Sequence, residues 1–294
     1  MLNEKGPILL ACNHPNSFLD GVILDTIFEQ PLYSLARGDV FKNPAANKFL
    51  TRLHLLPVYR TSEGVENLSS NYETFDECLR IFRQDGIVII FSEGRCINEW
   101  HLRPLKKGTA RLTMAAWGSE IPLRVLPVGI NYSSFRRFGK NLFINFGTFI
   151  NSNEVDLTLP EGTRYQAFNQ LLEDQLGQLV FEIDKKDKEK QRRLLQLSPS
   201  TTEWIFFFIP AMLGLLIHAP MYLPVKYLTL SWTRHNDHYD SVVTALLLFL
   251  YPAYLVALSI IAYSFTKSPL SFLIILVAPL MAWAYVRLKP QLDR

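Results

Sequence analysis

The sequence predicts an α/β fold, with a mixed and mostly parallel sheet flanked by helices, followed by C-terminal transmembrane helices. Over residues 1–200, short apolar stretches alternate with helical patterns, which is typical of a sheet covered by helices. The strongest apolar stretch, residues 87–91, is β-branched and uncharged, as in a strand that is buried on both faces. Residues 203–286 are dominated by Leu, Ile, Phe, Ala and Tyr, which suits a lipid environment.

Each element follows from a local pattern. The predicted strands are residues 7–12, 33–36, 54–59, 87–91, 123–130 and 142–150. The predicted helices are residues 17–29, a helix that begins at Asn43-Pro44, and residues 62–84, 107–117 and 163–197. Within 62–84, apolar side chains recur every three or four residues, which gives the helix one apolar face. Asp85-Gly86 is expected to end that helix.

The chain has 294 residues, of which 49% are hydrophobic and 19% charged. This length allows one sizeable α/β domain and an additional region. The hydrophobic residues are concentrated after residue 200, so we expect a globular domain over residues 1–200 and a membrane region over residues 201–294. The three cysteines form no CxxC pair and no metal-ligand spacing, which favours a reducing compartment over a disulfide framework.

The membrane region is expected to contain one transmembrane hairpin, because a spanning helix needs about 20 apolar residues. Residues 242–265 meet this length without a charge, residues 270–286 nearly do, and a short polar turn joins them. Residues 204–225 contain three prolines and a histidine, which are unfavourable in a straight lipid-facing helix. We therefore expect 204–225 to be re-entrant or interfacial. The alternative is that all three segments cross.

The distribution of charge along the chain predicts how the protein is oriented in the membrane. The net charge is only +3, but residues 185–193 form a dense and mainly basic run, and the C-terminal tail is also basic. The positive-inside rule favours both on the cytoplasmic side, so we expect an integral membrane protein with its globular domain in the cytoplasm. The basic run is either a solvated helix face or a segment that faces anionic lipid headgroups. No basic stripe with interleaved aromatic residues indicates nucleic-acid binding.

A histidine and an aspartate at the first strand-to-helix junction suggest acid–base chemistry. His14 follows the strand 7–12, and Asp20 lies about one and a half helical turns further on. Such a carboxylate can accept a hydrogen bond from one ring nitrogen, which leaves the other nitrogen free to take a proton from an alcohol near neutral pH. Alone, this pair is more often structural.

Cationic residues follow two other predicted strands. Arg95 comes shortly after the strand 87–91, within Phe91-Ser92-Glu93-Gly94-Arg95, and Arg60 follows the strand 54–59. Lys107 begins a predicted helix. Ligands bind at strand ends in α/β sheets, and the planar guanidinium group suits phosphate. Each cation alone is better explained as a surface residue, but together they suggest a phosphate site.

Together these stretches resemble the glycerophosphate and lysophosphatidate acyltransferases of the PlsC-like superfamily, over roughly residues 7–150. The matching motifs are Asn13-His14 with Asp20, Val58-Tyr59-Arg60, Phe91-Ser92-Glu93-Gly94-Arg95, and Leu126-Pro127-Val128-Gly129-Ile130. The resemblance implies a glycerolipid acyltransferase fold and a reaction in which His14 deprotonates the acceptor hydroxyl while Asp20 orients it. The donor would be acyl-CoA or acyl-carrier protein.

The resemblance also implies that Arg60, Glu93, Gly94, Arg95 and Lys107 bind the acceptor, glycerol 3-phosphate or lysophosphatidate, in phospholipid biosynthesis. It implies no metal and no organic cofactor. The chain departs from the family pattern in two places, with five residues between His14 and Asp20 where four are usual, and with Ser92 in place of a common proline.

Other functions remain open at this stage. The chain could be a non-catalytic membrane protein that binds anionic lipid, or an acyltransferase for a lipid alcohol without phosphate. A hydrolase with Ser17 or Ser92 as nucleophile is less favoured, because no Gly-x-Ser-x-Gly elbow is present. A metal site at His235, Asp237 and His238 is also less favoured than a solvated loop, because no firmly spaced third set of ligands accompanies them.

Overall fold

The computed structural model describes residues 3–59 and 70–292. The chain divides into two compact units, one formed by residues 1–131 and 143–185 and the other by residues 132–142 and 186–294. This division differs from the expected boundary at residue 200. It differs because the loop at residues 132–142 packs with the C-terminal helices, where Gly139 lies against Val286.

The first unit contains a six-stranded sheet with the order β3-β2-β4-β1-β5-β6. The strands are β1 (Ile8–Cys12), β2 (Leu32–Arg37), β3 (Leu55–Val58), β4 (Ile87–Phe91), β5 (Arg124–Tyr132) and β6 (Leu142–Phe146). The central strand β1 pairs in parallel with β4 and β5, and β2 pairs in parallel with β3 and β4. The carboxyl ends of β1 and β4 therefore meet at one edge, with Cys12 opposite Phe91.

The last strand reverses direction. Gly147 donates its backbone N–H to Pro127, and Ile150 forms an antiparallel bridge with Val125. Later residues of one segment thus face earlier residues of the other, as in an antiparallel pair. The predicted mixed and mostly parallel sheet is confirmed.

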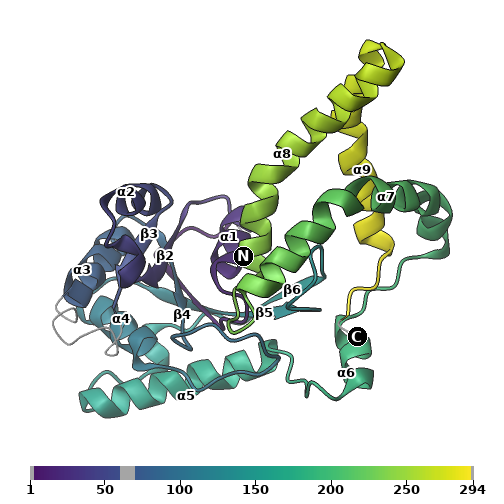
Figure 1. Cartoon of the computed structure of the whole chain (residues 1–294). Helices are drawn as coiled ribbons and strands as arrows, with labels where there is room; N and C mark the ends of the chain where they lie inside the picture. The colour runs from purple at the N-terminus through teal and green to yellow at the C-terminus, as the bar shows by residue number, and fades with distance from the viewer. Residues whose placement is uncertain (1–2, 60–69, 293–294) are drawn as a thin grey trace. The chain divides into compact units, whose positions relative to one another are not determined.

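Helices cover both faces of this sheet (Figure 1). Leu9 and Ala11 of β1 belong to a core formed with three of the helices. On the opposite face, a Cβ at Gly21 would contact the Ser34 side chain of β2 at 3.5 Å, which places the first helix there. The helices are α1 (Phe18–Ile27), α2 (Pro44–Arg52), α3 (Ser70–Phe82), α4 (Lys107–Gly118) and α5 (Glu161–Leu179), and α3, α4 and α5 build the core face.

Helix boundaries follow local chemistry. Asn43 caps α2, since its side-chain oxygen accepts from Ala45 N at 2.9 Å, and Pro44 occupies the first turn, where its missing N–H costs nothing. The N–H of Gly86 bonds to Ile81 after α3 ends, at the predicted position. The predicted start of that helix, near residue 62, lies outside the described residues.

The predicted continuous helix over residues 163–197 is wrong. Helix α5 ends at Leu179, and a separate helix, α6 (Lys188–Leu195), follows. Between them, Phe181 N donates to the Asn131 side chain at 2.7 Å, and Ile183 N donates to the Trp100 carbonyl at 2.9 Å. These bonds to distant residues, together with the full burial of Ile183, replace the helical hydrogen bonds that the local sequence favours.

The second unit contains three helical segments that are long and apolar enough to cross a membrane. They are α7 (Thr201–Trp232), α8 (Tyr239–Thr266), and η5 (Pro269–Leu273) with α9 (Ile274–Leu288). Many of their large hydrophobic side chains are exposed, which suits lipid contact. Segments α8 and α9 correspond to the expected hairpin, and α9 runs beside α8 (Figure 1).

Helix α7 contains Pro210, Pro220 and Pro224, and it bends along its length (Figure 1), as interior prolines cause. Near its start, Glu203 forms an ion pair with an arginine in the last turn of α9, at 2.7 Å. Its midpoint, Gly214, abuts the Met281 backbone, about two turns inside α9.

Candidate active site

The loop after β1 is tied to β5 by one buried side chain. The Asn13 Nδ2 group donates to the Ile130 carbonyl at 3.0 Å, and its Oδ1 accepts from Ile130 N at 2.7 Å. Because both ends of the amide are used, the loop leaves the sheet in a defined orientation. His14 is the next residue.

His14 and Asp20 form the hydrogen bond that the sequence predicts. His14 Nδ1 lies 2.9 Å from Asp20 Oδ2, and the same oxygen accepts from Asn16 N at 2.8 Å. Asp20 is fully buried, whereas 17% of the His14 side chain is exposed. Since a carboxylate only accepts, Nδ1 donates, and Nε2 is the ring nitrogen that can take up a proton. The spacing of five intervening residues therefore still allows the contact.

The His14 ring stacks on Phe91, the last residue of β4, with ring centroids 4.0 Å apart and planes inclined by 15°. The hydrogen bond from Nδ1 to Asp20 and a flat aromatic surface hold the imidazole in one orientation. The first and third motifs therefore meet where β1 and β4 end side by side.

Glu93 joins the two loops at this edge. One carboxylate oxygen accepts from His14 N at 2.9 Å, and the other accepts from Arg103 N at 2.9 Å. The side chain is only 3% exposed. Burial raises the pKa of this carboxyl above its ordinary value, while the hydrogen bonds from Arg103 and His14 act in the opposite direction. Glu93 was predicted to bind substrate, and in this geometry both of its oxygens contact the protein backbone.

Sequence reasoning missed the segment that covers the His14 loop. Ile97 N donates to the His14 carbonyl at 3.2 Å, Asn98 Nδ2 donates to the Pro15 carbonyl at 2.8 Å, and Ser17 N lies 2.9 Å from Cys96 Sγ. These contacts use backbone atoms and short polar side chains without periodicity. No sequence pattern predicts contacts of this kind.

The two serines of the hydrolase hypothesis lie in different surroundings. Ser92 is buried, and its hydroxyl accepts a hydrogen bond from the Thr109 hydroxyl at 3.0 Å. Ser17 precedes α1 with φ of 54° and has no side-chain capping bond.

The remaining residues that were predicted to bind substrate lie in different surroundings. Gly94 has φ of +72°, and a Cβ there would lie 2.9 Å from the Lys106 side chain, so this turn favours glycine. Arg95 follows it and is exposed. Arg60 lies outside the described residues.

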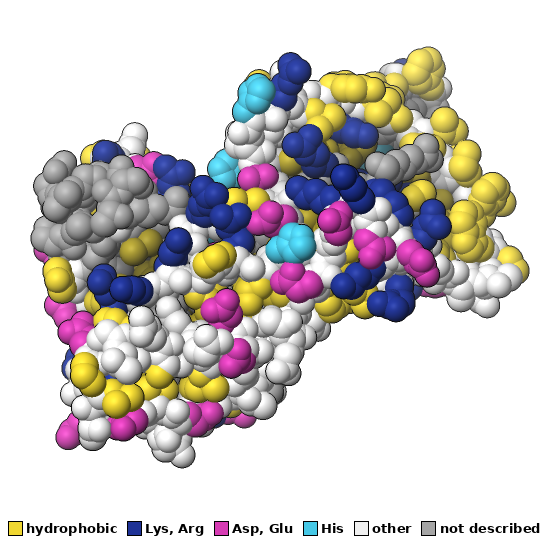
Figure 2. All heavy atoms as spheres, turned by 90° about the horizontal axis from the view of Figure 1, so that it is seen from below, with side chains coloured by type: hydrophobic (Ala, Val, Ile, Leu, Met, Phe, Trp, Pro, Cys, Tyr) yellow, Lys and Arg dark blue, Asp and Glu magenta, His cyan; other side chains and the backbone are white. Residues whose placement is uncertain are grey.

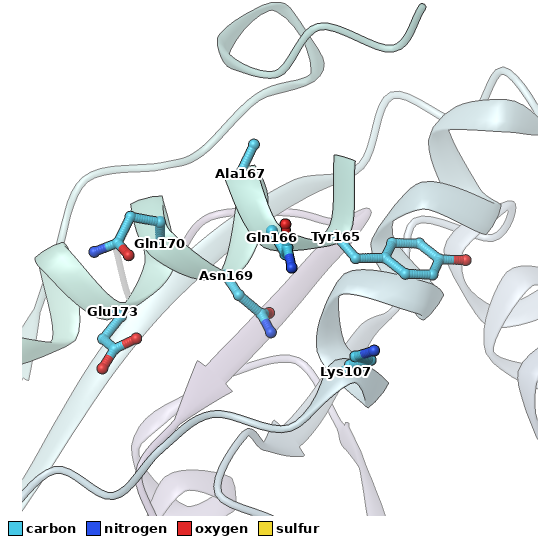
Figure 3. A pocket seen from close by; sticks show the side chains of 7 residues that line it. All are labelled: Lys107, Tyr165, Gln166, Ala167, Asn169, Gln170 and Glu173. Carbon is cyan, nitrogen blue, oxygen red and sulfur yellow. The ribbon is translucent and has the colours of Figure 1, made fainter. Parts of the chain in front are cut away.

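Lys107 begins α4 and lines a cavity of about 510 Å³ against α5. Gln166 and Asn169 point from α5 toward the side where Lys107 lies (Figure 3). The other lining residues are Tyr165, Ala167, Gln170 and Glu173. Neither His14 nor Arg95 lines this cavity.

No group of three or more His, Cys, Asp or Glu side chains is arranged for metal binding in residues 3–59 and 70–292. His235, Asp237 and His238 lie between α7 and α8. The expectation that the reaction needs no metal or organic cofactor stays a prediction.

Residues 1–131 match the family model described as Acyltransferase. The match contains His14, Asp20 and the loop after β4. This region is therefore similar to acyltransferases. The match bears out the expected resemblance to acyltransferases over residues 1–131 and supports the expectation of an acyltransferase enzyme.

Among solved structures, the chain is similar to the crystal structure of PlsC, the 1-acyl-sn-glycerophosphate (LPA) acyltransferase from Thermotoga maritima. The TM-score is 0.41 and the identity 15%, over 62% of this chain and 70% of the other. No curated protein sequence matches.

Proposed function

We propose that this acyltransferase moves a fatty acyl group from acyl-CoA or acyl-carrier protein to a hydroxyl of glycerol 3-phosphate or lysophosphatidate, in phospholipid biosynthesis. The hydrogen bond between His14 Nδ1 and Asp20 Oδ2 carries this proposal. It provides an oriented base at the sheet edge, next to a loop that bears an exposed arginine.

In the proposed reaction, His14 Nε2 removes the proton from the acceptor hydroxyl. The oxygen attacks the thioester carbonyl, and a tetrahedral intermediate forms. As the carbon–sulfur bond breaks, the thiolate leaves and takes the proton from His14. Asp20 stabilises the transient imidazolium through Nδ1, as a buried carboxylate does. The ester and the free thiol are the products, and no acyl-enzyme is needed.

Arg95 is proposed to bind the acceptor phosphate. It is exposed and lies two residues after Glu93, whose carboxylate contacts the His14 backbone. A guanidinium group can donate two hydrogen bonds to one phosphate. Gly94 would allow close approach of the backbone, and Arg60 and Lys107 would add positive charge.

The membrane is proposed to hold the acceptor and the product near the enzyme. Three long apolar helical segments support membrane association, and the basic run at residues 185–193 supports a catalytic domain on the cytoplasmic side. A lipid bilayer would then be a partner in addition to the soluble acyl donor.

The first test measures acyl transfer by the purified chain in detergent. Acyl-CoA or acyl-carrier protein is supplied with glycerol 3-phosphate, with lysophosphatidate, or with a lipid alcohol that lacks phosphate. His14→Ala should lower kcat on the order of 10²- to 10⁴-fold, the usual contribution of a general base, with little change in acceptor KM. Full activity in this variant would exclude His14 as the base.

The second test concerns the phosphate. Arg95→Ala should raise the acceptor KM about 10- to 100-fold, because a charge-assisted hydrogen bond to phosphate is lost. Arg83→Ala, at an exposed position after α3, is the matched control and should behave like the wild type. An unchanged KM in Arg95→Ala, or equal rates with the phosphate-free alcohol, would refute the phosphate assignment.

A further inference from the structure

Four cationic side chains gather in the second unit, where its apolar helices end. Arg137 and Lys140 belong to the loop between β5 and β6, Lys226 to the last two turns of α7, and Lys289 follows α9 directly. The Lys140 side chain is buried, and the other three residues are half-buried. We call them the basic cluster.

Two members of the basic cluster are held by reciprocal hydrogen bonds. The Lys289 ammonium donates to the Phe138 carbonyl in the loop. Arg137 donates to the Pro290 carbonyl, just after α9, at 3.0 Å. Both acceptors are backbone carbonyl groups, and these bonds fix the positions of the two cations.

One carboxylate pairs with a member of the cluster. Asp240, in the first turn of α8, pairs with Lys140. The two side chains are 3% and 7% exposed. Lys140 also lies over the Tyr132 ring, with its nitrogen 5.4 Å from the centroid. This buried ion pair anchors the loop to α8. It involves Lys140 and not Lys289.

The charged neighbours that act on Lys289 are positive. Burial, the largest cause, and the charges of Arg137, Lys140 and Lys226 together lower the pKa of Lys289 to about 8. Like charges disfavour one another in a half-buried site. An anion placed among them would be stabilised by several cations at once.

The surroundings of the cluster indicate which anion. Leu223, Tyr227 and Leu228 flank Lys226 and are exposed, as is Trp232 at the end of α7. Exposed Tyr and Trp beside Lys are typical of the level of the membrane at which lipid headgroups lie. The space-filling view likewise shows Lys and Arg side chains close to exposed hydrophobic side chains (Figure 2).

We propose that the basic cluster binds the phosphate of an anionic phospholipid headgroup, with the lipid chains against the exposed apolar side chains of α7. This site is additional to the one proposed for acyl transfer. It uses side chains of the second unit, and it needs no reaction at His14.

The test measures lipid binding by the full chain in neutral detergent, through the rise in Tm and through the dissociation constant. The probes are phosphatidylglycerol, phosphatidylcholine with the same acyl chains, and inorganic phosphate. The double variant Lys226→Gln/Lys289→Gln should bind phosphatidylglycerol about 25-fold more weakly, since each lysine near an anionic headgroup contributes roughly fivefold. Lys267→Gln, in the exposed turn between α8 and η5, is the matched control and should keep wild-type affinity.

Three outcomes would overturn the proposal. They are equal affinity for phosphatidylcholine, equal stabilisation by inorganic phosphate at the same concentration, and wild-type affinity in the double variant. Lys289→Arg keeps the charge and should keep the affinity, which separates loss of charge from loss of folding. A loss of binding in Arg95→Ala but not in the double variant would assign the lipid to the acceptor site instead. His14→Ala should lose activity and keep lipid binding.

Discussion

Glu93 shows how a single buried side chain can hold a reactive one in position. Its two oxygens accept from the backbone of His14 and of Arg103, so it connects the loop after β1 to the loop after β4. The imidazole is in turn oriented by Asp20 and Phe91. We therefore interpret Glu93 as a positioning residue that acts through His14.

Glu93→Gln should lower kcat about 10- to 100-fold, because small misplacements of a base are costly. A glutamine offers one oxygen and one NH₂ group, so one of the two backbone amides loses its acceptor, which costs about 1–3 kcal/mol of stability. Steady-state kinetics and thermal unfolding measure both effects. The control is Glu99→Gln, which removes a partly exposed ion pair with Arg103. If Glu93→Gln raised acceptor KM and left kcat unchanged, the residue would instead bind substrate.

The three thiols should differ in reactivity toward a maleimide at pH 8. Burial raises the pKa of Cys78 to about 12 and the pKa of Cys12 well above its ordinary value, so neither thiol ionises appreciably at this pH. Cys96 is partly exposed and should react first. Peptide mass mapping of the folded protein measures this order, and early modification of Cys78 would show that the core opens readily.

At the scale of elements, close backbone packing decides how the C-terminal helices meet. The midpoint of α7 lies against α9 at Gly214, where a Cβ would be 2.3 Å from the Met281 carbonyl oxygen. Ala211 and Ala284 are buried in the same contact. Small residues let two helix backbones approach closely in a membrane.

Gly214→Ala should therefore destabilise the second unit, because the helix backbones must separate to admit even one methyl group. We expect a lower Tm and a lower yield in detergent, with a loss of about 1–3 kcal/mol as in other overpacked sites. Gly177→Ala is the control, because no atom lies within 4 Å of a Cβ there. That exchange in α5 should be neutral or slightly stabilising. An unchanged Tm for Gly214→Ala would contradict the close contact.

At the scale of the whole molecule, contacts within the second unit bear on its membrane topology. Glu203 at the start of α7 pairs with Arg287 in the last turn of α9. Three helices that crossed in series would put these two ends on opposite sides. Lys226, near the end of α7, also lies within electrostatic reach of Lys289. The start of α7 therefore lies near the end of α9, as a re-entrant or interfacial 204–225 would require, and this topology stays a prediction.

In the predicted topology, both termini would lie in the cytoplasm and the turn after α8 on the far side. Ser198→Cys and Ser268→Cys, in a chain whose own cysteines are replaced, should react with a membrane-impermeant maleimide from opposite sides of sealed vesicles. A C-terminal tag should be accessible from the same side as residue 198. Labelling of the tag and residue 198 from opposite sides would show that all three segments cross.

The sequence by itself predicted the α/β class, the strands and the pairing of His14 with Asp20. These depend on short-range patterns, such as apolar runs that must be buried and a carboxylate about one and a half helical turns after a histidine. Only the tertiary structure decided the rest. The break after α5 arises because Phe181 and Ile183 bond to residues far away in the chain. Glu93 took a positioning role, and the basic cluster formed from a loop and two helix ends, because both depend on which distant backbone groups the fold brings within hydrogen-bonding reach.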